Sequence, residues 1–177
     1  MKYRYKIVAF CFSCLVLIGC DRATKDLARE RLKDQHAHSY FHDTIRLLYV
    51  ENTGAFLSLG TEWPPAVTLW VFTILPALFL SAFFIVVLRK SRQITSFEMA
   101  SLLLIFCGGI GNLIDRIVFD KHVADFLNLG VLNFRTGIFN IADVYVTTGV
   151  FLLLIKYIKK LFILRKAQDD SPSQGSG

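Results

Sequence analysis

The stretch Ala66–Leu88, which reads AVTLWVFTILPALFLSAFFIVVL, contains 23 residues and no charged side chain. The hydrocarbon core of a bilayer is about 30 Å thick, and a helix needs about 20 residues to cross it. We therefore expect this stretch to cross a membrane, which makes the chain an integral membrane protein.

Three further apolar blocks flank this stretch. Ile7–Gly19 and Met99–Ile114 contain no charged residue, and Ile138–Ile155 contains a single one, Asp143. The sequence therefore predicts an all-α membrane protein with four transmembrane helices. We expect these spans at about residues 5–20, 66–88, 95–116 and 140–160.

The composition agrees with this prediction. Hydrophobic residues make up 54% of the chain and charged residues 19%, whereas about a quarter of the residues of soluble domains are charged. This excludes a disordered chain and a disulfide-rich secreted module. We expect one integral-membrane domain over residues 1–167, followed by a polar, disordered cytoplasmic tail at 168–177.

The basic residues are concentrated in three segments. They precede the first span, lie between the second and third spans and follow the fourth, and these segments carry a net charge of +8 against −2 for the rest of the chain. An excess of Lys and Arg marks cytoplasmic segments. Both termini are therefore expected in the cytoplasm, with the loops 21–65 and 115–137 outside. The overall charge of +6 then reflects topology and requires no nucleic-acid partner.

The first apolar block has a second interpretation. Lys2, Arg4 and Lys6 precede it, and it ends in Leu17-Ile18-Gly19-Cys20, which resembles the lipobox of a cleaved lipoprotein signal peptide. Three further spans disfavour an exported lipoprotein, so we expect a first helix that is retained.

The long outer loop combines two kinds of local pattern. Asp21–Lys33 has a helical composition, and Asp21 and Lys25 have the i,i+4 spacing of an ion pair. Thr44–Val50 is rich in β-branched and aromatic residues and predicts a short strand or hairpin.

Polar side chains gather at the outer ends of the third and fourth spans. Asn112, Asp115 and Arg116 share one helical face, and Asn140 and Asp143 form a second i,i+3 pair. An Asp115–Arg116 ion pair and an N-cap at Asn140 would explain some of them structurally. Ionisable groups at membrane depth nevertheless usually mark function.

Asp143 has no basic residue near it in its own span, since the next one is Lys156. Its partner must come from elsewhere, and Asp125, which lies in the apolar stretch Val123–Leu127, is the natural candidate. Two carboxylates that face each other in a dry site cannot both ionise, so one serves as acid and the other as base. Such a pair can activate water and hydrolyse a peptide bond.

Five motifs occur in order along the chain. They are Asp21-Arg22-Ala23-Thr24-Lys25, Asn52-Thr53-Gly54-Ala55-Phe56, Gly111-Asn112-Leu113-Ile114-Asp115-Arg116, Val123-Ala124-Asp125-Phe126 and Phe139-Asn140-Ile141-Ala142-Asp143. In these five motifs and in their positions relative to the four spans, nearly the whole chain resembles the lipoprotein signal peptidases (type II signal peptidases), which are membrane aspartic proteases.

The resemblance implies a catalytic dyad of Asp125 and Asp143. The residues expected to contact substrate are Asn52, Gly54, Asn112, Arg116 and Asn140. The residues expected to support the architecture are Asp21, Lys25 and Asp115.

The resemblance also implies a small extracytoplasmic β-cradle and a surface helix beside the site. The expected substrate is a prolipoprotein that carries diacylglyceryl on its lipobox cysteine and is cut just before that cysteine. Globomycin-like peptides should inhibit the enzyme. No metal or other cofactor is expected, and the protein should be a monomer among the lipids of a bacterial inner membrane.

Two departures from the family pattern bear on the shape of the substrate pocket. The family usually has Asn-x-Gly-Ala-Ala-Phe, whereas this chain has Asn52-Thr53-Gly54-Ala55-Phe56-Leu57. Arg22 stands where the family usually has Gln. Neither departure affects the dyad.

Other functions leave weaker signals. A non-enzymatic adaptor, or a small transporter that uses Asp143 for a proton or cation, is the alternative class. Cys11 and Cys14 have the spacing of a zinc pair but no second pair nearby, and we expect all four cysteines to be buried free thiols. The outer-loop histidines His36, His38 and His42 are expected to form a solvated cluster.

Overall fold

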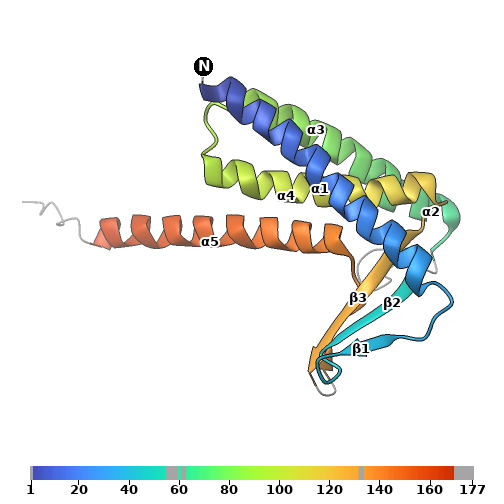
Figure 1. Cartoon of the computed structure of the whole chain (residues 1–177). Coiled ribbons are helices and arrows are strands. Elements are labelled where there is room, and N and C mark those ends of the chain that lie inside the picture. The colour runs from blue at the N-terminus through green and yellow to red at the C-terminus, as the bar shows by residue number, and fades with distance from the viewer. Residues whose placement is uncertain (1, 55–59, 61–62, 132–133, 170–177) are drawn as a thin grey trace, which may run out of the picture.

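The computed structural model describes residues 2–54, 60, 63–131 and 134–169 (Figure 1). Its helices are α1 (Lys2–Leu32), α2 (Pro65–Leu69), the π-helical turn η2 (Trp70–Ile74), α3 (Leu75–Lys90), α4 (Ser96–Val118) and α5 (Ile141–Asp169). Its strands are β1 (His38–Tyr40), β2 (Ile45–Asn52), β3 (Val123–Val131) and β4 (Phe134–Arg135).

Four helical segments are long and apolar enough to cross a membrane, and this confirms the predicted four-span fold. They are Arg4–Leu32, Pro65–Lys90, Ser96–Val118 and Ile141–Lys166. The last helix continues to Asp169, into the segment predicted as a tail, whereas residues 170–177 lie outside the described part of the chain.

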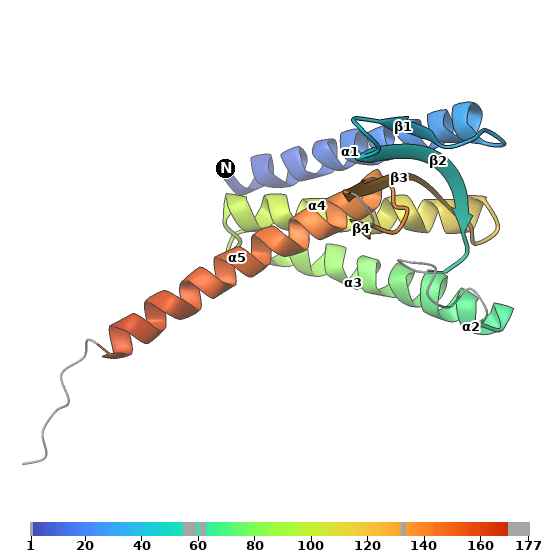
Figure 2. The same ribbon diagram turned by 90° about the horizontal axis from the view of Figure 1, so that it is seen from below.

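α4 is the central helix of the bundle, because α1, α3 and α5 all pack against it. α5 crosses α4 and then leaves the other helices, as Figures 1 and 2 show. We call the end of the bundle where α1 and α4 finish and α5 begins the sheet end, since the strands attach there (Figure 1). The opposite end is the far end.

Local sequence explains how the helices begin and bend. α4 starts with a capping box, in which the Thr95 hydroxyl accepts from the Glu98 amide (3.2 Å) and Glu98 Oε2 accepts from the Thr95 amide (2.9 Å). In the second span, Pro76 has no N–H to donate to the carbonyl of Phe72, and the π-helical turn Trp70–Ile74 lies at that position. A proline is a common cause of such a local change of helix register.

α1 continues well beyond residue 20, where the first span was predicted to end. The helix runs unbroken to Leu32, so the helical composition of Asp21–Lys33 is confirmed as an extension of the same helix. The charged residues after Cys20 suggested that the apolar span ends there, but protein partners neutralise several of them. A separate surface helix is not found in the described part of the outer loop, of which residues 55–59 and 61–62 are not described.

The four strands form one antiparallel sheet in the order β1-β2-β3-β4. The strand predicted at Thr44–Val50 is confirmed as β2. The register between β2 and β3 shifts between Leu47 and Val50, and beyond this shift Val50 lies opposite Asp125. A β-bulge of this kind bends a strand and redirects its side chains.

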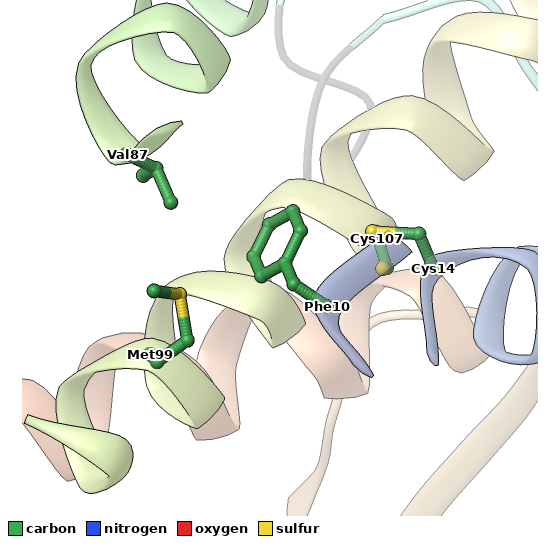
Figure 3. Close-up of a cluster of buried hydrophobic side chains, with 5 residues drawn as sticks. All are labelled: Phe10, Cys14, Val87, Met99 and Cys107. Carbon is green, nitrogen blue, oxygen red and sulfur yellow. The ribbon is translucent and has the colours of Figure 1, made fainter. Parts of the chain in front are cut away.

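A buried apolar cluster fills the middle of the bundle. It comprises Phe10, Cys14, Val87, Met99 and Cys107, and Figure 3 shows the two cysteine sulfurs side by side between α1 and α4. All four cysteines are free. Burial was predicted for all of them, but it is wrong for Cys11 and Cys20, which are exposed on the surface of α1.

Glycine allows α4 and α5 to approach closely. A Cβ added to Gly108 would lie 2.3 Å from the backbone oxygen of Ala142, and one added to Gly149 would lie 2.5 Å from that of Ser101. Backbone atoms cannot move aside as the end of a flexible side chain can. Close contact of this kind between small residues is typical of helix pairs in membranes.

A deeply buried charge cluster holds the sheet end together. Lys25 is fully buried, and its ammonium group contacts Asp21 Oδ2 (2.9 Å), Asp115 Oδ2 (3.0 Å) and Asn112 Oδ1 (3.0 Å). Three acceptors therefore satisfy its three donors. Asp21 also accepts from the backbone amide of Ala142 in α5 (2.9 Å), so the cluster joins α1, α4 and α5.

We predict that Gly108→Ala destabilises the protein by about 1–3 kcal/mol, because the new methyl group overpacks the contact with α5. Its melting temperature in detergent should fall. Gly19→Ala is the matched control, since a Cβ there meets nothing within 4 Å and alanine favours the helix. Equal melting temperatures for the two variants would contradict the close-packing argument.

We predict that Lys25→Met costs about 3–5 kcal/mol, because it leaves two buried carboxylates without their shared cation. Lys33→Met should change the melting temperature little, since Lys33 pairs with Glu51 at the exposed surface. The comparison uses thermal unfolding of both variants in the same detergent. A Lys25→Met protein as stable as wild type would show that the cluster does not hold the bundle.

Candidate active site

The two carboxylates predicted to be catalytic come from different elements. Asp125 lies in the buried half of β3 and is 3% exposed. Its Oδ2 accepts from Asn52 Nδ2 (2.9 Å) and its Oδ1 from Asn140 Nδ2 (2.7 Å). Both oxygens are therefore held by neutral amide donors, and no cation bonds directly to either of them within the described chain.

Asp143 lies in the first turn of α5 and is partly buried. Its Oδ1 accepts from Asn112 Nδ2 (2.8 Å), and its Oδ2 accepts from the backbone amide of Asn140 (3.1 Å). Asn140 Oδ1 in turn accepts from the backbone amide of Asp143 (3.0 Å). This reciprocal pair caps α5, so the predicted N-cap at Asn140 is confirmed.

Asn140 joins the two carboxylates. Its side-chain amide donates to Asp125, while its backbone amide donates to Asp143. Asn140 is fully buried, so a single rigid residue sets the position of one acid relative to the other. The spacing of the motif predicted the cap but did not predict the contact with Asp125.

Burial, together with the nearby charge of Asp143, raises the pKa of Asp125 to about 6. The hydrogen bonds from Asn52 and Asn140 oppose this shift, because they stabilise the ionised form. Asp125 can therefore hold a proton under mildly acidic conditions, as one member of a carboxylate pair must.

Asn112 links the charge cluster to the site. Its Oδ1 accepts from Lys25 Nζ (3.0 Å) and from Asn140 Nδ2 (3.1 Å), while its Nδ2 donates to Asp143. The ammonium group cannot accept a hydrogen bond, so it fixes which end of the Asn112 amide faces Asp143. Lys25 thereby orients a donor toward a carboxylate that it does not itself contact.

Arg116 lies on the same side of α4 as Asn112 and contacts the backbone just beyond the end of β2. Its Nη2 donates to the backbone oxygen of Gly54 (2.9 Å), and the amide of Gly54 donates to Asn52 Oδ1 (2.9 Å). The Nε of Arg116 is buried and has no hydrogen-bond partner in the described part of the chain. It is a donor that a bound ligand could use.

The predicted Asp115–Arg116 ion pair is wrong. Asp115 is fully buried and forms ion pairs with Arg22 and Lys25 from α1, and it also accepts from the amide of Ala124 (3.3 Å). Neighbouring residues on a helix point about 100° apart, so Asp115 faces α1 while Arg116 faces the site. Arg22, noted in the sequence only as a departure, is thus part of the supporting cluster.

A cavity of about 280 Å³ adjoins Asp143 on the surface of α5. Apolar and hydroxyl side chains line it, among them Phe139, Val144, Thr147 and Thr148. The cavity could take an extended segment with an apolar side chain next to the carboxylate. Residues 55–57, which contain the second departure from the family pattern, lie outside the described chain.

The histidines of the outer loop lie at the surface, as predicted. His36, His38 and His42 are exposed. Among residues 2–54, 60, 63–131 and 134–169, no group of three or more His, Cys, Asp or Glu side chains could hold a metal ion.

Comparison with known proteins supports the same family that the motifs suggest. The family model described as signal peptidase (SPase) II matches residues 13–159. The chain is 35% identical over 170 residues to the lipoprotein signal peptidase of Borreliella burgdorferi (strain ZS7), covering 93% of this chain and 95% of that protein. It is 34% identical over 171 residues to the lipoprotein signal peptidase of Borreliella afzelii (strain PKo), covering 94% and 95%.

Two solved structures, both bacterial membrane enzymes determined by the in meso method, share the fold. One, at 2.3 Å resolution, has a TM-score of 0.71 and 22% identity and covers 96% of each chain. The other, at 1.9 Å, has a TM-score of 0.74 and 24% identity and covers 86% of this chain and 94% of its own. The family model spans most of the chain, and the two Borreliella relatives match it almost end to end. The chain therefore belongs to the signal peptidase II family of lipoprotein signal peptidases.

Proposed function

We propose that this member of the family is an aspartic endopeptidase that uses Asp125 and Asp143 to activate water. Membership in the family makes the protein a membrane protease that removes signal peptides from prolipoproteins. The observation that carries the finer proposal is Asn140, which donates to both carboxylates and so pairs them in one site. The substrate is a diacylglyceryl-modified prolipoprotein, cut just before the lipidated cysteine.

In the proposed reaction Asp143 is ionised and Asp125 is protonated. The raised pKa of Asp125 favours its neutral form and makes it the member of the pair that holds the proton. Asp143 takes a proton from water as the water oxygen attacks the scissile carbonyl, and Asp125 gives its proton to the carbonyl oxygen. When the C–N bond breaks, Asp143 protonates the leaving amine and Asp125 regains its proton from the hydroxyl group.

Arg116 and the asparagines are proposed to hold the substrate backbone. The buried Nε of Arg116 is available to a carbonyl oxygen, and a buried donor without a partner is costly unless a ligand uses it. The cavity beside Asp143 is proposed to take the residue next to the scissile bond. The acyl chains of the substrate then remain in lipid beside the bundle. The proposal includes no cofactor.

We further propose that both termini lie in the cytoplasm and that the sheet end faces outward from a bacterial inner membrane. The N-terminus of α1, the end of α3 and the end of α5 lie at the far end, and these are the basic segments of the chain. Residues 1–167 are proposed to form a single domain that acts as a monomer among membrane lipids. Globomycin-like peptides are proposed to bind at the dyad.

An adaptor or a proton-coupled transporter would also place a carboxylate at the end of a span. Neither an adaptor nor a transporter needs a second carboxylate, Asp125, that Asn140 also holds. The family match likewise favours a peptidase. Purified protein mixed with a diacylated lipobox peptide separates these functions, since only a peptidase releases the two fragments.

We predict that Asp125→Asn and Asp143→Asn each reduce cleavage of that peptide by about 100- to 10,000-fold, the usual contribution of an acid or base catalyst. Both changes keep the size of the side chain, so the melting temperature should change far less than the activity. Asp120→Asn is the control, because Asp120 is exposed and its left-handed backbone (φ 45°) suits asparagine. Near-normal cleavage by either dyad variant would contradict the proposed roles.

We predict that kcat/KM falls as the pH rises through about 6, because Asp125 loses its proton there. In Asn52→Ala this alkaline limb should move to higher pH. The lost hydrogen bond had stabilised ionised Asp125, so its removal raises the pKa of Asp125. Thr53→Ala should leave the profile unchanged, and an Asn52→Ala limb that stays in place or moves to lower pH would refute the assignment.

A further inference from the structure

Exposed apolar side chains gather at the tip of the sheet, where it is farthest from the bundle. Outside the four spans, six large hydrophobic side chains of the described residues are exposed. One of them is Trp63, and the other five are Tyr40 (48% exposed), Phe41 (76%), Leu129 (39%), Val131 (65%) and Phe134 (88%). A cluster of this kind on a folded protein usually marks an interaction surface.

Strand pairing brings these five residues together, although they lie almost a hundred positions apart. Tyr40 pairs with Ile45, which pairs with Leu129 on its other side. Val131 pairs with Phe134 across the next strand pair. The amide of Gly130 in β3 donates to the oxygen of Thr44 (2.9 Å) and ties β3 to the turn between β1 and β2. We call these five side chains the sheet tip.

The backbone at the tip is held in an unfavourable conformation. Phe41, His42 and Asp43 all have positive φ (52°, 52° and 65°), which is uncommon for residues other than glycine. The Asp43 side chain stabilises this turn by accepting from Ser39 Oγ and Arg46 Nε, both at 2.6 Å. Strain of this kind persists where the surrounding structure and function require it, and here it directs a phenyl ring outward.

The charged groups at the tip form one network with a net positive charge. Arg46 and Arg135 both contact Asp43, with Arg135 Nη1 also 2.7 Å from its backbone oxygen. The hydrogen bond from Arg46 lowers the pKa of Asp43 well below its usual range, with help from Ser39. Asp43 therefore stays ionised at neutral pH, and the three groups carry one net positive charge. This arrangement suits an anionic lipid surface.

The tip also lies at a suitable depth. Figure 1 shows that the sheet extends sideways from the bundle and that its tip is level with the first turns of α5 and not beyond the helix ends. Aromatic side chains with a polar or basic neighbour are typical of the membrane–water interface. We propose that the sheet tip inserts into the lipid interface at the sheet end, with lipid as the partner that covers it.

This anchor supports the sheet at both of its ends. The bundle holds the end of β3 that carries Asp125, and lipid holds the end that carries Val131. A lipidated substrate would then meet the sheet at the level of its own glyceryl group. The inference concerns only how the sheet sits in the membrane and does not depend on the proposed chemistry.

The experiment places tryptophan at the tip. The native tryptophans are first removed as Trp63→Phe and Trp70→Phe, and Phe134→Trp or Phe41→Trp is then introduced. Each full-length protein is reconstituted into nanodiscs of phosphatidylcholine and phosphatidylglycerol brominated near the glycerol end of the acyl chains. We expect strong quenching of the tip tryptophan relative to nanodiscs without bromine.

Lys33→Trp in the same background is the matched control, because Lys33 follows the end of α1 and is exposed. It should be quenched by aqueous iodide and not by brominated lipid. A tip tryptophan that behaves like the control, with iodide quenching only, would overturn the inference, and so would protection from both quenchers, which would point to a protein partner. Neither result bears on peptidase activity.

A second arm measures function. Phe41→Ser combined with Phe134→Ser should lower cleavage of a diacylated peptide several-fold in nanodiscs, but should leave cleavage in detergent and the melting temperature unchanged. Cleavage in nanodiscs equal to wild type would contradict a role for the anchor. Equal loss in nanodiscs and detergent would show a folding defect and would likewise contradict it.

Discussion

The ammonium group of Lys25 is the charge on which the sheet end of the bundle depends. A cation without a partner is very costly at this depth, so it must be matched by acceptors at fixed positions. Asp21, Asp115 and Asn112 supply them, and Asp21 in turn holds the first turn of α5 through the amide of Ala142. α1, α4 and α5 therefore cannot shift independently without exposing a buried charge.

The same constraint reaches the candidate reaction centre. Asn112 accepts from Lys25 and for that reason must present its amino group to Asp143. Asn140, held by Asn112 and by its capping bonds, presents its own amino group to Asp125. Two carboxylates thus receive neutral donors in a site from which cations are kept one contact away. That separation leaves one carboxylate able to keep a proton, whereas a directly bonded lysine would favour ionisation of both.

The sequence predicted the parts of the fold that depend on composition and local pattern. The lengths of the apolar runs, compared with the thickness of a bilayer, located four spans, and a run of β-branched and aromatic residues located β2. The extension of α1 to Leu32 was missed, because whether charged residues end a span depends on partners distant in the chain. Helical spacing placed Asp115 and Arg116 near the site, but it could not show that Asp115 pairs with Arg22 instead.

The motifs predicted Asp125 and Asp143, the two carboxylates that the structure brings together. The order of the motifs along the chain did not show that Asn140 donates a hydrogen bond to both of these carboxylates. The sheet tip left no signal either, since residues near 41 and 134 meet only through strand register. Local patterns therefore predict elements and caps, whereas long-range pairing decides which polar groups meet.

We propose above that Asp125 and Asp143 act together on one water molecule. The most direct test is a structure of the protein bound to a diacylated lipobox peptide in which a hydroxyethylene group replaces the scissile amide. We expect the hydroxyl within hydrogen-bond distance of both carboxylates, with the backbone on either side held by Arg116 and the asparagines. A hydroxyl that contacts only one of the two carboxylates, or neither, would contradict it.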